Sequence, residues 1–286
     1  MAQSQQVWLI TGAARGLGFE IAKSAIEAGH KVLACYRKKP EDTTNFDKLE
    51  SLGGIWTQLD PSSEDAESRV RALVSEHGQI DVLVNNAGYG MMSSTEDIPV
   101  NVAQDIFNTN FFGPLRTIKG VLPSMREHKT GTIVNVSSSV VFHPHAGMGM
   151  YAATKNALEA FTETLQAELK TFDIRVMLVE PGATATEFGS PAGTSVMVPL
   201  SEPYTQEGGA IKQVLDWLLT GGLEGVASPS QAVAQRIVEA VDGTGFMAGK
   251  EIDLRLILGK DAGQQAEGRA AVYNNMMGLK EVWSSV

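Results

Sequence analysis

The stretch VWLITGAARGLGFEIAKSAIEAG, residues 7–29, combines a short apolar run, a glycine-rich turn and a segment of helical length. The run VWLIT, residues 7–11, fits a buried strand, and the apolar residues after Gly18 recur every three or four positions, as on one face of a helix. Glycine permits tight turns that other residues resist. The stretch therefore predicts a strand–turn–helix unit, which is the first half of a βαβ motif.

The same alternation of strand-like and helix-like segments continues through most of the chain. Further strands are predicted at 31–36, 55–60, 82–87, 132–137, 175–180 and 251–256, and helices near 16–28, 64–77, 101–127 and 151–171. Several strands are continuous apolar runs, as expected where helices cover both faces of a parallel sheet. We therefore predict an α/β fold in one domain, residues 1–286: a doubly wound parallel sheet (Rossmann fold) of about seven strands, with helices on both faces.

Two segments depart from this rhythm. Residues 183–228 form a long excursion that begins with turn-rich sequence and carries an apolar stripe at helical spacing from Ile211 to Leu219. Long excursions are uncommon unless they cover or bind a ligand, so we expect a substrate lid here; a packed surface insertion is the alternative. Residues 259–286 predict a C-terminal helical extension that docks on the body or on a partner subunit.

Composition excludes several classes of protein. The chain has 286 residues, of which 43% are hydrophobic and 20% charged, so it can bury a sizeable core. Its formal net charge of −10 disfavours nucleic acid or an anionic membrane as a partner. Cys35, the single cysteine, fits a reducing compartment. The first residues do not resemble a signal peptide, and no run approaches a membrane span, so we expect a cytoplasmic protein.

The glycine turn predicts a binding site for a dinucleotide. Gly12, Gly16 and Gly18 follow the first strand, where a tight turn and a close approach of the backbone to a pyrophosphate need glycine. The helix behind them offers free N–H groups and a favourable dipole to that anion. A glycine motif alone is weak, but the strand–turn–helix context makes this one specific.

The residues after the second strand indicate which dinucleotide is bound. A site for NAD usually carries an acidic side chain there, which grips the ribose 2′-hydroxyl. This chain instead has Arg37 and Lys38, with Arg15 in the glycine turn, and these cations favour a 2′-phosphate. We therefore predict NADP(H). The alternative is that Arg37 and Lys38 are solvated surface charges.

Tyr151 and Lys155 form a candidate acid–base pair. Residues four apart share one face of a helix, and a cation near a tyrosine favours its phenolate, so we expect Lys155 to lower the pKa of Tyr151. Ser138 lies thirteen residues upstream and could donate a hydrogen bond to a reacting oxygen. On its own the pair would fit an ordinary helix surface, and only the other motifs weaken that interpretation.

The motifs together resemble those of the single-domain short-chain dehydrogenase/reductase family, over roughly residues 5–255. The matching motifs are TGAARGLG (11–18), LD (59–60), NNAG (85–88), Asn110 in FNTNFFG, VNVSSS (134–139), YAATK (151–155) and EPGATAT (180–186). The resemblance implies a Rossmann fold and hydride transfer with a nicotinamide dinucleotide. It leaves the substrate open, because one fold serves many substrates.

The resemblance also assigns residues to the cofactor. Asp60 would contact the adenine, and Lys155 would bind the nicotinamide ribose. The full set of implied cofactor-binding residues is Thr11, Gly12, Arg15, Gly16, Leu17, Gly18, Arg37, Asp60, Asn86, Ala87, Gly88, Tyr151, Lys155, Pro181, Gly182, Thr184 and Thr186.

A catalytic tetrad of Asn110, Ser138, Tyr151 and Lys155 is implied in the same way. Tyr151 would exchange a proton with the substrate oxygen, Ser138 would fix that oxygen, and Asn110 would hold a water that relays protons to Lys155. The thirteen-residue interval selects Ser138 among three consecutive serines; Ser139 is the alternative if the loop is shifted.

The loops expected at the carboxyl ends of the strands are rich in methionine and phenylalanine. Candidate substrate contacts are Met91, His145, Met150 and Phe188. Their apolar character suggests a fairly bulky hydrophobic carbonyl or alcohol. His143 and His145 flank a proline and could ligate a metal, but no further cluster of ligands supports this, so we predict no metal site.

The sequence thus predicts an NADP(H)-dependent oxidoreductase that interconverts a ketone or aldehyde and its alcohol, with Tyr151 as proton donor or acceptor. We expect a small-molecule substrate and a homodimer or homotetramer. Two alternatives remain open. One is a catalytically idle dinucleotide-binding regulator, which would not need the tetrad. The other is an epimerase, lyase or dehalogenase on the same fold.

Overall fold

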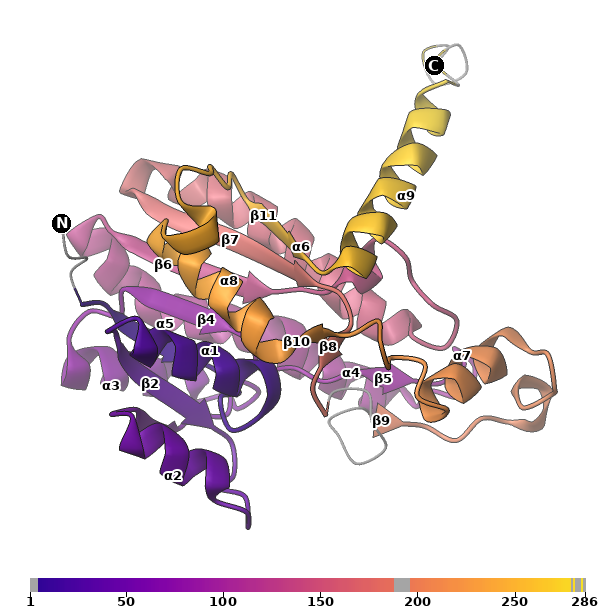
Figure 1. Cartoon of the computed structure of the whole chain (residues 1–286), viewed down its shortest axis with the longest axis horizontal. Helices are drawn as coiled ribbons and strands as arrows, with labels where there is room; N and C mark the ends of the chain where they lie inside the picture. The colour runs from indigo at the N-terminus through magenta and orange to yellow at the C-terminus, as the bar shows by residue number, and fades with distance from the viewer. Residues whose placement is uncertain (1–4, 188–195, 279, 281–283, 285–286) are drawn as a thin grey trace.

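A parallel sheet forms the centre of the molecule (Figure 1). The computed structural model describes residues 5–187, 196–278, 280 and 284. Within them, seven strands pair in parallel in the order β11-β7-β6-β4-β1-β2-β3. The strands are β1 (Val7–Ile10), β2 (Lys31–Tyr36), β3 (Ile55–Gln58), β4 (Val82–Asn85), β6 (Gly131–Val136), β7 (Ile174–Pro181) and β11 (Arg255–Leu258). The predicted doubly wound α/β fold is confirmed.

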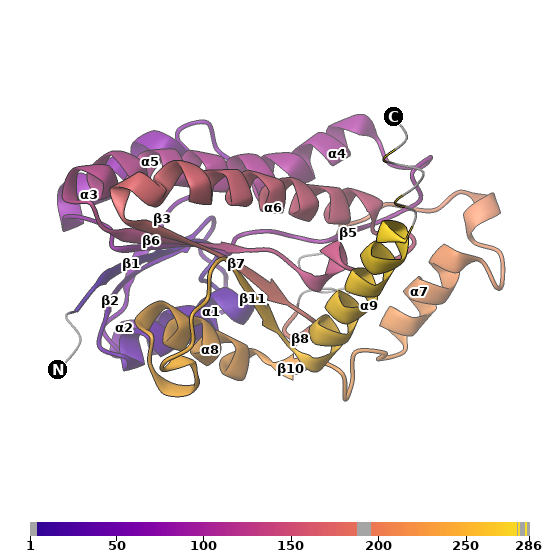
Figure 2. The ribbon, with the colours of Figure 1, turned by 90° about the horizontal axis from the view of Figure 1, so that it is seen from above.

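Helices cover both faces of the sheet, as Figure 2 shows. One face carries α1 (Gly16–Glu27), α2 (Thr44–Ser51) and α8 (Ser230–Asp242). The other carries α3 (Ala66–His77), α4 (Val100–Phe107), α5 (Gly113–His128) and α6 (Gly149–Leu169). Each face has its own apolar core: Ile21 and Ile237 pack on one, and Val70 and Leu165 on the other. The central strands read as continuous apolar runs because both of their faces are buried in this way.

The chain reverses its direction of winding between β1 and β4. From β1 it proceeds to β2 and β3, and from β4 it proceeds the opposite way to β6, β7 and β11. Ligands of open α/β sheets bind at such a switch point, outside the carboxyl ends of the strands. The fold therefore places the candidate site where the segments after β1 and β4 meet.

Several helix and strand boundaries predicted from the sequence are wrong. The helix predicted at 101–127 is interrupted by a π-helical turn, Asn108–Phe112. Pro114 follows that turn and has no N–H to donate to the carbonyl of Asn110. The regular series of α-helical hydrogen bonds is therefore interrupted here. Helices α2 and α8 were not predicted. The last strand pairs at Arg255–Leu258 instead of 251–256, because those residues are in register with the end of β7.

Short strand pairings hold the excursion after β7: one joins it to the loop after β4, and one joins its start to its end. Strand β5 (Met91–Met92) pairs with β9 (Val196–Met197), and β8 (Thr184–Ala185) pairs with β10 (Ser228–Pro229). The excursion also carries α7 (Ala210–Leu219). The backbone N–H of Ser201 donates to Asp97, and the Tyr204 hydroxyl donates to Glu96. Its function as a lid stays a prediction.

The last helix, α9 (Lys260–Met277), projects from the body (Figure 1). Only Ala262, in its first turn, is buried. Asp261 in the same turn accepts a hydrogen bond from the backbone N–H of Ala183, which ties the base of the helix to the segment after β7. None of the helices described has the length and apolarity needed to span a bilayer.

Candidate active site

Thr11 and Asn86 join the turn after β1 to the segment after β4. The Thr11 hydroxyl accepts hydrogen bonds from the backbone N–H groups of Asn86 and Ala87, at 3.0 Å each. The Asn86 amide donates to the carbonyls of Thr11 and Gly12. Two residues predicted to line a cofactor therefore also fix the geometry of the turn that would hold it.

The glycines of this turn are required by space as well as by conformation. Gly12 has φ of +67°, and a Cβ on it would lie 2.9 Å from the Cα of Ala87. A Cβ on Gly18 would lie 2.3 Å from the Gly12 carbonyl oxygen and 2.4 Å from the Asn86 amide nitrogen. Helix α1 begins at Gly16, directly behind the turn. This narrow, side-chain-free cradle at a helix N-terminus fits a pyrophosphate.

The predicted tetrad comes from three elements and converges near Gly88. Tyr151 and Lys155 lie one turn apart on α6, and both are 5% exposed. The Lys155 Nζ is 5.9 Å from the centroid of the Tyr151 ring. A Cβ on Gly88 would lie 3.0 Å from Asn110 Oδ1 and 3.7 Å from Lys155 Nζ. Gly88 thus leaves room for both side chains.

Asn110 lies in the π-helical turn, and hydrogen bonds fix its side chain. Its Oδ1 accepts from the backbone N–H of Tyr89 at 3.1 Å. Its Nδ2 donates to the Tyr89 carbonyl and to the Thr154 hydroxyl of α6. The widened turn points this amide inward, toward α6, and the side chain is 1% exposed. The proposed water relay through Asn110 stays a prediction.

Ser138 stands at the end of β6, where the backbone leaves the sheet. It caps a short 3-10 turn, Ser139–Val141, and its hydroxyl accepts a hydrogen bond from the Val140 N–H at 3.3 Å. The same hydroxyl shares a hydrogen bond with Tyr151. Ser139 is 7% exposed and belongs to the 3-10 turn. This contact with the tyrosine favours Ser138 over Ser139 as the acting residue.

Burial dominates the acid–base properties of the pair. It raises the pKa of Tyr151 to about 12, and the hydrogen bond with Ser138 only partly offsets the rise. Burial likewise lowers the pKa of Lys155 to about 8, against the attraction of Glu159. The expected lowering of the Tyr151 pKa is therefore wrong for this structure: burial raises the pKa, and the hydrogen bond with Ser138 is the effect that opposes burial. Tyr151 is left protonated at neutral pH, which suits a proton donor.

The segment after β7 supplies the remaining predicted contacts. Pro181 ends the strand, and the Thr184 hydroxyl donates to the Gly182 carbonyl at 3.1 Å. A Cβ on Gly182 would lie 2.2 Å from Asp261 Oδ1, so α9 packs tightly on this segment. A Cβ on Gly16 would lie 3.5 Å from Thr186, so this segment reaches the glycine turn.

The residues predicted to select the cofactor lie at the surface. Arg37 follows β2 and is exposed. Arg15 is half exposed and pairs with Glu187 at 3.2 Å. Asp60 is partly buried, and its Oδ1 accepts from both the N–H and the hydroxyl of Ser62. Leu17, in the first turn of α1, packs against the core. Contact of any of these residues with a cofactor stays a prediction.

The candidate substrate residues divide by burial. Met91 is 1% exposed and packs with Tyr151 in a third apolar cluster, which Met150 also joins. His145 is exposed and stacks edge-on against His143. Phe188 lies outside the described residues. Among the residues described, no group of three His, Cys, Asp or Glu could hold a metal ion.

The sequence model of the short chain dehydrogenase family matches residues 6–195, well over half of the chain. The chain belongs to the short chain dehydrogenase family. It is accordingly an oxidoreductase of that family, and its seven-stranded sheet is the fold that the family's solved structures share.

Individual relatives agree with this assignment. Oxidoreductase claN of Passalora fulva is 44% identical over 64% of this chain and 84% of its own. Oxidoreductase BOA17 of Botryotinia fuckeliana is 35% identical over 93% of each chain. The crystal structure of a short-chain dehydrogenase from Streptomyces avermitilis has a TM-score of 0.84 and 31% identity over 99% of each chain.

Other relatives have more specific names. Human retinol dehydrogenase 8 is 38% identical over 66% of this chain and 62% of its own. The 3-ketodihydrosphingosine reductase of Bacteroides thetaiotaomicron is 37% identical over 70% of this chain and 71% of its own. Two more distant structures share the fold. The short chain dehydrogenase from Burkholderia cenocepacia, in complex with NADP, is 23% identical, with a TM-score of 0.69 over 96% of this chain and 97% of its own. The one from Burkholderia phymatum, in complex with NAD, is 21% identical, with a TM-score of 0.72 over 90% of each chain.

Sequence reasoning missed the charged residues that anchor α6 and the segment after β7. Glu159 lies four residues after Lys155 on α6 and is 6% exposed. Arg255 and Asp261 come from the C-terminal part of the chain, yet they reach α6 and the segment after β7. The spacing of Glu159 from Lys155 was a usable signal. No local pattern could have placed Arg255, since its partners are 75 to 96 residues away in sequence.

Replacement of Gly18 by alanine tests the cradle. The added Cβ would overlap the Gly12 carbonyl and the Asn86 amide, so we expect a loss of about 1–3 kcal/mol in unfolding free energy and weaker dinucleotide binding. Urea denaturation and cofactor titration measure the two effects. Gly263→Ala in α9 is the control, because no atom lies within 4 Å of the added Cβ. Equal behaviour of the two variants would contradict the packing argument.

The burial of Lys155 predicts a pH-dependent stability. Its pKa falls from 10.5 to about 8, so the folded protein holds fewer protons than the unfolded chain between these values, and stability rises with pH across that window. We expect wild type to gain up to about 3 kcal/mol relative to Lys155→Met between pH 8 and 10.5. Urea denaturation across this range measures the gain. Exposed Lys170→Met is the control, and a constant difference between wild type and Lys155→Met would refute the expectation.

Proposed function

We propose that this protein is an NADP(H)-dependent reductase that converts a ketone or aldehyde to its alcohol. The proposal is supported chiefly by one observation: a buried Tyr151 lies beside Ser138 and Lys155, at the switch point next to the glycine turn. The residues of the glycine turn and Lys155 would hold the cofactor, which when bound supplies the hydride.

The roles of the side chains follow from the movement of charge. Reduction of a carbonyl places negative charge on its oxygen, and Tyr151 can donate a proton there while the Ser138 hydroxyl donates a hydrogen bond. The phenolate that Tyr151 would become is favoured by the nearby Lys155 ammonium. A phenol whose pKa is about 12 is protonated at neutral pH, as the proton donor in carbonyl reduction has to be.

The proposed preference for NADP(H) is supported by the positive charges in the glycine turn and after β2. Arg15 and Arg37 offer guanidinium groups, and no carboxylate follows β2 at the position where an NAD site would carry one. The pairing of Arg15 with Glu187 leaves Arg37 as the better candidate for a 2′-phosphate.

The substrate is proposed to be a fairly bulky hydrophobic molecule. The third apolar cluster surrounds Tyr151 with Met91, Met148, Met150 and Phe142. An open cleft of about 480 Å³ lies between α9 and the loop after Ser138; Phe142, Pro144 and Val272 give it apolar walls, and its polar lining residues include Asp261, Gln264, Gln265 and Arg269. That volume suits a small-molecule ligand. The names of two relatives, retinol dehydrogenase 8 and 3-ketodihydrosphingosine reductase, point to substrates with long apolar chains.

The remaining parts of the proposal concern the location, oligomeric state, partners and domain organisation of the enzyme. We propose a cytoplasmic homodimer or homotetramer without nucleic-acid or membrane partners, with residues 183–228 as a substrate lid and the chain as a single domain. The acidic net charge of −10 and the absence of a spanning helix in the described residues are compatible with this setting.

Removal of the Tyr151 hydroxyl tests the reaction. With NADPH and a panel of hydrophobic ketones, we expect Tyr151→Phe to lower kcat on the order of 10²–10⁴-fold with little change in NADPH affinity, because only the proton donor is lost. Exposed Tyr273→Phe on α9 is the control. Near-normal turnover by Tyr151→Phe would overturn the mechanism. An idle regulator would oxidise no NADPH, and a non-redox enzyme would convert substrate without net change in cofactor.

Cofactor selectivity is tested at Arg37. We expect a lower KM for NADPH than for NADH in the wild type. Arg37→Ala should raise the KM for NADPH by about tenfold or more and leave that for NADH nearly unchanged, since a charge-assisted contact to the 2′-phosphate is lost. Arg71→Ala on α3 serves as the control for an exposed arginine. A wild-type preference for NADH would defeat the assignment.

A further inference from the structure

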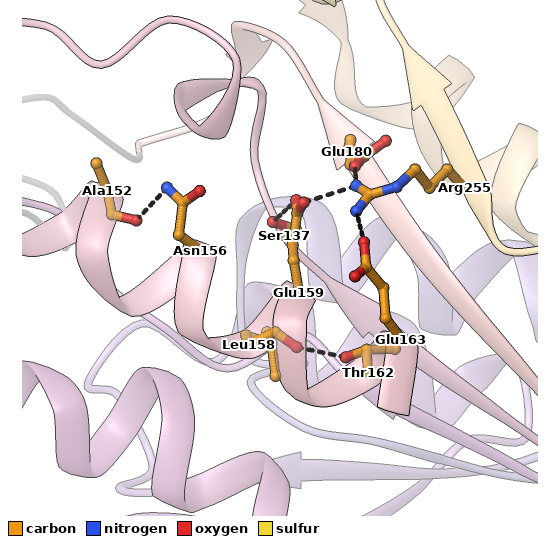
Figure 3. Close-up of polar contacts among 9 residues, drawn as sticks. All are labelled: Ser137, Ala152, Asn156, Leu158, Glu159, Thr162, Glu163, Glu180 and Arg255. Carbon is orange, nitrogen blue, oxygen red and sulfur yellow. Dashed lines mark hydrogen bonds and ion pairs between the residues drawn. The ribbon is translucent and has the colours of Figure 1, made fainter. Parts of the chain in front are cut away.

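A group of charged side chains joins α6 to β7 and β11 one helical turn beyond Lys155 (Figure 3). Arg255 of β11 is at its centre. Its Nη1 donates to Glu159 Oε2 at 2.6 Å and also contacts Glu180, and its Nη2 contacts Glu163. Glu159 and Glu180 are 6% and 0% exposed, whereas the Glu163 side chain is 53% exposed. The two buried carboxylates therefore share one guanidinium.

Glu159 uses its second oxygen to hold the segment that presents Ser138. The Ser137 hydroxyl donates to Glu159 Oε1 at 2.6 Å, as Figure 3 shows. Ser137 is 3% exposed, and its backbone N–H donates to the Val179 carbonyl at 2.7 Å. Because Ser138 is the next residue, its position depends on this anchored neighbour.

Glu159 also lies on the same buried face of α6 as Lys155. Residues four apart on a helix are neighbours, and here both are almost fully buried. The Lys155 Nζ donates to the Val136 carbonyl at 2.8 Å, directly before Ser137. One carboxylate thus contacts the strand end beside Ser138 and comes from the residue one helical turn after Lys155, on the same buried face of α6. In a poorly hydrated site a carboxylate at this position favours the charged form of a lysine.

We propose that Glu159 is a positioning residue, which keeps Lys155 in its ammonium form at working pH and fixes the strand end that presents Ser138. This inference rests on the reductase function proposed above. The attraction of Glu159 opposes the effect of burial on the pKa of Lys155, so the direction of the interaction agrees with the geometry.

The positive charge of Arg255 offsets the repulsion between the carboxylates of Glu159 and Glu180. Two carboxylates close together in a buried site repel each other, and burial together with Glu159 raises the pKa of Glu180 to about 7. The charged or titratable groups that face Glu159 in the described residues are Lys155 and Glu163 of α6, Glu180 of β7 and Arg255 of β11. The guanidinium of Arg255 compensates Glu159 from a strand at the edge of the sheet.

The experiment measures the pKa of Lys155 directly in the full-length protein. Lysine labelled with ¹³C at Cε gives one resonance per residue, and Lys155→Met identifies the resonance of Lys155. We expect both Glu159→Gln and Glu159→Met to lower the Lys155 pKa by about half a unit or more, because a neighbouring negative charge is lost. The alkaline fall in kcat/KM for ketone reduction should move to lower pH by the same amount.

Glu163→Gln is the matched control. Glu163 also contacts Arg255 and lies on α6, but it is half exposed and two turns from Lys155. This variant should leave both the resonance midpoint and the alkaline limb in place. Glu159→Asp keeps the charge and should hold the Lys155 pKa near that of the wild type.

Each outcome decides the inference. An unchanged Lys155 midpoint in folded Glu159→Gln overturns it, and so does loss of folding in both Glu159 variants while Glu163→Gln folds, since Glu159 would then be structural. A purely structural role would lower kcat without moving the midpoint. The titration needs no substrate, so absence of ketone reduction by the wild type would refute the proposed function while leaving this measurement readable.

Discussion

The site depends on a lysine ammonium that is held almost without water next to a buried tyrosine. Burial of a charge is costly, and the lowered pKa of Lys155 reflects that cost. The neighbouring structure supplies what water would have given: the Val136 carbonyl accepts from the ammonium, Gly88 leaves space for it, and Glu159 provides the opposite charge. The same dry surroundings keep Tyr151 protonated. Acid–base chemistry near neutral pH thus follows from how this pocket excludes solvent.

The parallel sheet brings these groups together because its strands all end at one edge. The turn after β1 and the segment after β4 meet at the switch point, where Thr11 and Asn86 bind them to each other. Ser138 follows β6, and the segment from Pro181 to Thr186 follows β7. Helix α6 crosses beside them with Tyr151 and Lys155. The fold itself therefore brings the glycine turn close to the side chains of Tyr151 and Lys155.

Two elements beside the site belong to less regular parts of the chain. The excursion after β7 is held to the loops near Asp97 by short pairings and single hydrogen bonds, and α9 is anchored at its base through Asp261. These contacts are few compared with those of the core. Apolar side chains surround Tyr151, whereas the cleft beside α9 has both apolar and polar lining residues.

The sequence by itself determined the sheet and most of its helices, and it predicted the four residues of the tetrad. Those features follow from local periodicity and from motifs whose spacing is short, such as the four residues between Tyr151 and Lys155. Only the tertiary structure decided the sign of the Tyr151 pKa shift, because desolvation depends on everything packed around the phenol. It also decided the break in the helix at Asn110 and the partners of Arg255. A guanidinium that reaches Glu159 across 96 residues of sequence is placed by strand order, which no local pattern encodes.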